Sequence, residues 1–128
     1  MNVLLDTVAL YRATVTPESL PRAVQELLLN ESNALFVSLV SAWELAIKSS
    51  LGKLPLPCPI GELFPQAARD LLAQQLEIDL NAVARVAELP PLHRDPFDRL
   101  IIAQALLHEC TVVTSDTQFA AYGVNVIW

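Results

Sequence analysis

Short apolar runs alternate with longer segments of helical spacing along this chain, and the alternation restricts the folds it can adopt. The apolar runs are largely continuous and cover residues 3–5, 34–37, 76–78, 111–114 and 124–127. Continuous runs of this length are typical of strands buried on both faces, as in a parallel sheet. Between them, apolar residues recur at helical spacing around residues 20–28, 40–51, 63–72, 83–87 and 101–106. The pattern predicts an α/β fold, a three-layer α/β/α sandwich around a central, mostly parallel, five-stranded sheet.

Length and composition predict one globular unit. A hydrophobic fraction of 53% among 128 residues is enough apolar material for a core, so we expect a single domain over residues 1–128. No apolar stretch approaches the ~20 residues needed to cross a bilayer. No basic region precedes the first apolar run, as a signal peptide would require. We therefore expect a soluble, cytoplasmic protein with no membrane partner.

Composition also excludes several kinds of site. Gly52, Gly61 and Gly123 are the only glycines, and they cannot form the glycine-rich loops that bind dinucleotides or cradle phosphates. Cys58 and Cys110 lie far apart without CxxC spacing, which predicts two reduced thiols rather than a zinc site or a disulfide. A net charge of −6 argues against binding nucleic acid through a broad basic surface. It leaves room for a nuclease that meets its substrate through metal ions.

Four acidic residues are predicted to gather at the carboxyl edge of the sheet. Asp6 and Asp116 follow predicted strands, and ligands of open α/β sheets bind at that edge. Glu44 lies in the helix after the second strand, and Asp98 lies in the first turn of the helix that leads to the fourth. Taken singly, each has a structural interpretation. Asp6 and Asp116 could cap helices, residues 41–44 (SAWE) form a possible capping box, and Asp95 with Pro96 could start the helix that carries Asp98.

Taken together, these carboxylates would repel one another in a partly buried pocket, so they need a cation. Carboxylate oxygens without histidine or thiolate nearby select a hard ion, which predicts Mg²⁺, with Mn²⁺ as an alternative, rather than zinc. His93 and His108 are poor ligand candidates. His108 is expected at a helix end, and His93 is expected to be a loop residue that contacts backbone.

Four stretches of the chain follow a known family pattern in order. They are LLDT at residues 4–7, SLVSAWELAIK at 38–48 followed by GKL, HRDPFDRLIIAQA at 93–105, and TSD at 114–116. With these motifs the sequence resembles the PIN-domain ribonucleases, specifically the VapC-type toxins of bacterial toxin–antitoxin pairs. The similarity spans nearly the whole chain, and the two helical stretches are its most specific part.

The resemblance implies a Mg²⁺-dependent endoribonuclease toxin that hydrolyses RNA, commonly structured RNA such as transfer RNA. It makes Asp6, Glu44, Asp98 and Asp116 the catalytic, metal-binding acids. It implies a cognate antitoxin that blocks the site, and a homodimer. Supporting roles fall to Thr114, whose hydroxyl would assist Asp116, and to Asp95, which we expect to be structural or to act behind the metal ligands. Where the family often has a polar residue after Asp6 and Thr7, this chain has Val8.

The nearest cations in sequence, Lys48, Arg94 and Arg99, are candidates for contacts with backbone phosphates. Lys48 could instead pair with Glu44 four residues earlier, and Arg99 could pair with a neighbouring acid. Two other functions remain open. A receiver-like signalling domain also gathers acids and Mg²⁺ at a sheet edge, but the lysine it needs after the last strand is missing. A catalytically inactive acidic metal-binding interaction domain is the other alternative.

Overall fold

A five-stranded parallel sheet organises the protein. The computed structural model describes residues 1–128, and the strands run in the order β3-β2-β1-β4-β5, with every neighbouring pair parallel. In chain order the elements are β1 (Asn2–Leu5), α1 (Thr7–Val15), the 3₁₀ turn η1 (Pro17–Ser19), α2 (Arg22–Leu29), β2 (Ala34–Ser38), α3 (Leu39–Ser50), α4 (Ile60–Asp70), β3 (Gln74–Leu76), α5 (Leu80–Glu88), α6 (Pro96–Leu107), β4 (Thr111–Val113), η2 (Thr117–Tyr122) and β5 (Val126–Ile127).

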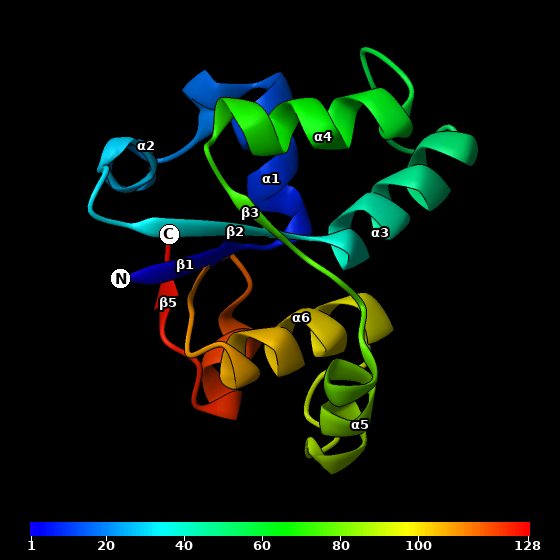
Figure 1. The fold of residues 1–128 in the computed structure, drawn as a ribbon. Coiled ribbons are helices and arrows are strands. Elements are labelled where there is room, and N and C mark those ends of the chain that lie inside the picture. The colour runs from blue at the N-terminus through cyan, green and yellow to red at the C-terminus, as the bar shows by residue number, and fades with distance from the viewer.

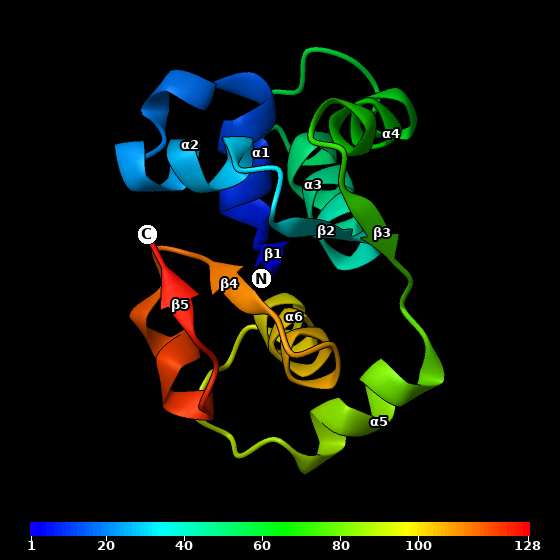
Figure 2. The ribbon, with the colours of Figure 1, turned by 60° about the vertical axis from the view of Figure 1, so that its left-hand side comes forward.

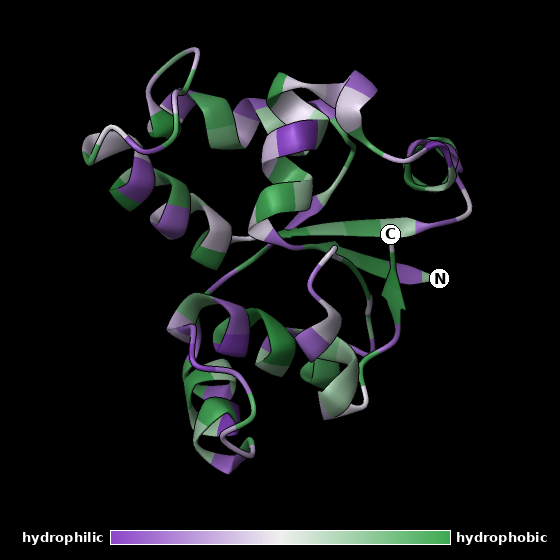
Figure 3. Ribbon diagram, turned by 180° about the vertical axis from the view of Figure 1, so that it is seen from behind, coloured by the Kyte–Doolittle hydropathy of each residue, from purple (hydrophilic) through white to green (hydrophobic).

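Helices cover both faces of this sheet. Helices α1 to α4 lie on one face, and α5, α6 and η2 lie on the other, with α5 outside α6 (Figures 1 and 2). Each face has its own apolar cluster: Val3 and Leu5 of β1 point into the first, and Leu4 points into the second. The central strands are accordingly hydrophobic over most of their length, apart from the exposed N-terminal end of β1 (Figure 3). The predicted three-layer α/β/α fold is confirmed, and its sheet is parallel throughout.

The central strands lie close to their predicted positions, whereas β3 and helix α1 differ. Strand β3 begins two residues earlier than the apolar run at 76–78 and includes exposed Gln74 and Gln75. At the edge of the sheet its outer positions face solvent, so apolar residues do not mark it. Helix α1 has no clear apolar stripe and was not predicted by spacing. It begins instead at a capping side chain, because Asp6 accepts a hydrogen bond from the Ala9 N–H at 2.8 Å.

Helix α6 is the most deeply buried helix. All six residues from Leu100 to Ala105 are buried, because the helix lies between the sheet and α5. Its start is specified locally: the Asp95 side chain caps the backbone N–H groups of Phe97 and Asp98, and Pro96 occupies the first helical position. A helix fixed in this way holds Asp98 at the carboxyl edge of the sheet.

Two further predictions can be compared with the structure. Cys58 and Cys110 are both free thiols, as predicted. None of the helices combines the length and the apolar character that crossing a membrane requires.

Candidate functional site

Four carboxylates from four different elements approach one another at the carboxyl edge of the sheet. Asp6 directly follows β1, Asp116 follows β4, Glu44 lies in α3 and Asp98 lies in α6. Trp43 and Phe97, which precede the two helical acids, pack edge to face with ring centroids 4.8 Å apart. This contact joins α3 to α6. The structure therefore brings together the four acids that the sequence singled out.

Asp6 is almost completely buried, at 5% exposure. Burial raises the pKa of its carboxyl, and the negative charges of Glu44 and Asp116 add to this. A side-chain hydrogen bond from Thr114 and the backbone N–H of Ala9 act in the opposite direction. Asp6 thus caps α1, as one interpretation predicted, and it also shares an electrostatic environment with other acids.

Glu44 has one paired and one unpaired oxygen. Its Oε2 accepts a hydrogen bond from Lys48 Nζ at 2.6 Å, whereas Oε1 is buried without any hydrogen-bond partner. A buried oxygen left without a partner costs about 1 to 3 kcal/mol, so proteins rarely leave one without a reason. The predicted capping box at residues 41–44 is wrong, because α3 begins three residues earlier with Ser38 as its cap. Glu44 therefore has no capping role.

Asp98 has the most perturbed carboxyl of the site. Burial, followed by the negative charges of Asp95 and Glu44, raises its pKa to about 7. Asp95 is the helix cap described above, and it also lies close enough to influence Asp98. Like charges that raise a pKa in this way are relieved by a cation. The arrangement of Asp98 is costly for the protein by itself and becomes favourable with a positive ion.

Asp116 lies opposite Asp98 and is held by the chain around it. Its Oδ1 accepts the Gln118 N–H at 2.9 Å and so caps η2, while its backbone N–H donates to Thr114 Oγ1 at 3.0 Å. The Thr114 side chain also hydrogen-bonds Asp6. Thr114 therefore connects two of the four acids, which extends its predicted contact with Asp116.

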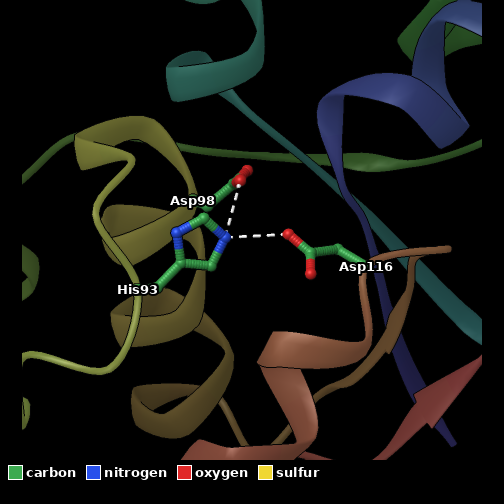
Figure 4. A group of neighbouring side chains, drawn as sticks. All are labelled: His93, Asp98 and Asp116. Carbon is green, nitrogen blue, oxygen red and sulfur yellow. Dashed lines mark hydrogen bonds and ion pairs between the residues drawn. The ribbon is translucent and has the colours of Figure 1, made fainter.

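His93 is the site residue that the sequence prediction missed. Its buried imidazole lies between two acids, with Nε2 2.8 Å from Asp116 Oδ2 and 3.1 Å from Asp98 Oδ2 (Figure 4). The prediction that His93 contacts backbone is correct, since Nδ1 accepts the Asp95 N–H at 3.0 Å, but leaving it out of the site was wrong. Two signals could have identified it: its place in the loop just before the Asp98 helix, and its position as the first residue of the 93–105 motif. The other histidine, His108, is exposed at the end of α6, as predicted.

The three candidate cations differ in how they are used. Lys48 forms the predicted pair with Glu44, a contact that raises its pKa and keeps it charged, yet its side chain remains 42% exposed. Arg94 is exposed beside the site loop. Arg99 is neither a phosphate contact nor the partner of an acid: its guanidinium donates to the carbonyls of Val86, Leu89 and Pro90 and to the Tyr122 hydroxyl. We therefore remove Arg99 from the predicted substrate contacts.

These donors fit a hard divalent cation. The site offers carboxylate oxygens, with the unpartnered Glu44 Oε1 among them, and no thiolate. Ligand atoms of His93, Asp98 and Asp116 lie within 4.8 Å of one another. Oxygen-rich sites of this kind suit Mg²⁺ or Mn²⁺ better than Zn²⁺.

Comparison with known proteins agrees with this geometry. The PIN domain family matches residues 3–125. No curated protein matches the sequence. Among solved structures, FitAcB from Neisseria gonorrhoeae is similar with a TM-score of 0.70 and 25% identity, covering 98% of this chain and 96% of that one.

Two DNA-bound complexes show the same fold at lower identity. VapBC2 from Rickettsia felis has a TM-score of 0.71 and 18% identity, covering 100% of this chain and 99% of that chain. VapBC from Salmonella typhimurium has a TM-score of 0.70 and 19% identity, covering 99% and 97%. The VapBC complexes share the fold of this chain, and the family match over residues 3–125 shows that the chain belongs to the PIN domain family.

Proposed function

We propose that this protein is a Mg²⁺-dependent endoribonuclease toxin that hydrolyses RNA phosphodiester bonds. The observation that carries the proposal is the buried, unpartnered Glu44 Oε1, in a site where burial and neighbouring negative charges raise the pKa of Asp6 and Asp98. Helix capping alone accounts for Asp6 and Asp116 but explains neither this oxygen nor the pKa of Asp98, which is raised to about 7. A bound divalent ion would give this oxygen a partner and would compensate the negative charge of Asp98.

In this proposal Asp6, Glu44, Asp98 and Asp116 hold the ion. When bound, Mg²⁺ supplies a water of lowered pKa and offsets the charge that develops on the phosphate. The carboxylates fix the position of that chemistry, because each is tied to a different rigid element. Lys48 pairs with Glu44 in the free protein and is placed to offer its ammonium to a phosphate once the ion neutralises Glu44. Because water attacks, the expected products carry a 5′-phosphate and a 3′-hydroxyl.

The substrate would approach along a groove beside the acids. The groove, of about 670 Å³, is lined by Lys48 together with Arg12 and Lys53, and Glu18 is the only acid in its lining. Arg12 is held over the Trp128 ring, with its guanidinium carbon 5.3 Å from the ring centroid. Three of the eight basic residues of an acidic chain thus line one groove next to Glu44. Together with exposed Arg94, they are our candidates for contacts with the RNA backbone.

Structured RNA, such as transfer RNA, is the substrate class we propose, on the strength of the VapC resemblance. The few aromatic residues, 6% of the chain, leave little surface for stacking on single-stranded bases, which favours recognition by shape. We also propose a cognate antitoxin, because VapBC and FitAB are toxin–antitoxin systems, and a homodimer. Exposed Leu80 and Val83 on α5 offer apolar surface for a partner protein.

The deciding experiment incubates the purified protein with total RNA and Mg²⁺, beside an EDTA sample and the Asp98→Asn variant. Asp70→Asn, a change of the same chemistry at an exposed acid outside the site, is the matched control. We expect cleavage by the unchanged protein and by Asp70→Asn, and loss of cleavage in the other two samples. Cleavage that persists equally with EDTA and with Asp98→Asn would refute the site, and 2′,3′-cyclic phosphate ends would refute attack by water. Failure of every sample to cleave, with thermal stability raised by Mg²⁺, would favour the catalytically inactive metal-binding interaction domain.

A further inference from the structure

The imidazole of His93 is held in one tautomer by the backbone. Its Nδ1 accepts a hydrogen bond from the Asp95 N–H at 3.0 Å. A backbone N–H can only donate, so Nδ1 must present a lone pair and cannot carry a proton in this arrangement. The ring proton therefore resides on Nε2. This conclusion depends only on heavy-atom geometry and on the fixed polarity of a peptide group.

An Nε2 that carries the proton is a donor and has no lone pair for a metal ion. It donates to Asp116 Oδ2 at 2.8 Å, and Asp98 Oδ2 lies 3.1 Å from the same nitrogen (Figure 4). His93 lies close enough to these acids to bind the same ion, but a protonated Nε2 cannot coordinate a metal. Its proton instead fixes one oxygen of Asp116, and the same N–H dipole attracts Asp98 Oδ2, so the imidazole influences the orientation of both groups.

The loop that carries His93 is anchored at several points. The Tyr122 hydroxyl accepts the backbone N–H groups of Leu92 at 3.1 Å and His93 at 2.7 Å, and donates to the Pro90 carbonyl at 2.9 Å. Arg99 donates to that same carbonyl at 3.0 Å and to the Tyr122 hydroxyl at 3.1 Å. These contacts explain why Arg99 is turned away from the substrate side. They hold the backbone that places the imidazole between the two acids.

We propose that His93 is a positioning residue of the metal centre: its Nε2–H donates to Asp116 and attracts the nearby carboxylate of Asp98, which orients both groups toward the ion without His93 binding the ion itself. The inference rests on the proposed function, since it concerns the same metal centre. In this arrangement His93 Nε2 contacts the metal-binding carboxylates but not the ion. The ion is then bound by oxygen atoms only, which favours Mg²⁺ over softer ions.

The tautomer can be observed directly. The chain has only two histidines, so long-range ¹H–¹⁵N correlation spectra of the imidazole rings contain two systems, and His108→Gln identifies the signals of His93. We expect a neutral ring protonated at Nε2, both in the metal-free protein and after saturation with diamagnetic Mg²⁺. A ring protonated at Nδ1 in either sample would overturn the proposal, because it would free Nε2 to bind the ion.

Metal affinity tests the positioning role. Titration calorimetry with Mg²⁺ and with Mn²⁺ measures the affinity for each ion. We expect His93→Ala to lower both affinities by about 10- to 100-fold, the usual effect of removing a hydrogen-bond partner of a metal ligand. His93→Gln, which keeps an N–H donor, should recover a large part of that loss, and His108→Gln should bind like the unchanged protein. The ratio of Mn²⁺ to Mg²⁺ affinity should stay constant across the series. A selective loss of Mn²⁺ binding in His93→Ala would show that a nitrogen ligand had been removed and would overturn the proposal.

Folding and function are checked separately. Thermal unfolding with EDTA establishes that each variant is folded. Should His93→Ala not fold, the comparison of His93→Gln with His108→Gln and the tautomer spectra still decide the outcome. Unchanged Mg²⁺ affinity in a folded His93→Ala would refute the positioning role alone, leaving RNA cleavage intact. Absence of any divalent-ion binding by the unchanged protein would refute the proposed function and this inference with it.

Discussion

Neutralising Asp98 should stabilise the metal-free protein. The carboxyl group has its pKa raised from 3.8 to about 7, so the folded state holds its proton more tightly than the unfolded state does. Stability from this group is therefore fully present below about pH 4 and is lost as the pH rises through 7. At about 1.36 kcal/mol per pH unit, the difference is worth roughly 2 to 4 kcal/mol, where the lower figure allows for water that reaches the 20% of the side chain still exposed.

Urea unfolding in EDTA at pH 8 and at pH 4.5 measures this effect. At pH 8 we expect Asp98→Asn to be more stable than the unchanged protein by roughly 2 to 4 kcal/mol. Near pH 4.5 the difference should be small, because the carboxyl is then protonated in the folded protein. Asp70→Asn, at an exposed position, is the matched control and should show no such pH-dependent gain.

Mg²⁺ should reverse the order. An ion at about 1,000 times its dissociation constant stabilises the protein that binds it by about 4.1 kcal/mol, which exceeds the predicted advantage of Asp98→Asn, and that variant should not gain this amount. A variant that is equally stable or less stable than the unchanged protein at pH 8 in EDTA would refute the electrostatic reasoning. Such a result would mean that the charge of Asp98 is already compensated by the protein itself.

Four further outcomes follow from the contacts described. Glu44→Gln should lower Mg²⁺-dependent RNA cleavage at least about 100-fold while the circular dichroism spectrum is preserved, and full activity would contradict a metal role for Glu44. Arg99→Met should cost about 3 kcal/mol in urea unfolding, because it leaves the Val86 and Leu89 carbonyls without a charged donor, whereas exposed Arg69→Met should cost little. Phe119→Ala, at a fully buried ring, should cost about 3 to 5 kcal/mol, and a loss below 1 kcal/mol would contradict its place in the core. Lys53→Gln should reduce the salt dependence of RNA binding by about 0.7 to 0.9 in log–log slope, unlike Arg22→Gln on α2, and equal slopes would exclude Lys53 from phosphate contact.

The fold class and the four acids were predictable from the sequence because they follow from local pattern. Continuous apolar runs mark strands buried on both faces, so the three central strands were found near their observed positions. In a parallel sheet the carboxyl ends of strands share one edge, which places Asp6 and Asp116 together before any coordinates are known. The start of α6 at Asp95 and Pro96 was equally predictable from the sequence, because a helix cap is a contact between residues that are close in sequence.

Tertiary structure decided which nearby side chains belong to the site. The sequence placed His93 close to Asp98, but only the fold brings Asp116, twenty-three residues further along, to within 2.8 Å of its imidazole. Arg99 is the opposite case. Its charge suggested a phosphate contact, but its guanidinium donates hydrogen bonds to the carbonyls of Val86 and Leu89 at the C-terminal end of α5. Local patterns report what a residue can do within a few positions of itself. A long polar side chain can reach several possible hydrogen-bond partners. Which of them it contacts depends on backbone far away in sequence, which comes close only when the helices pack on the sheet.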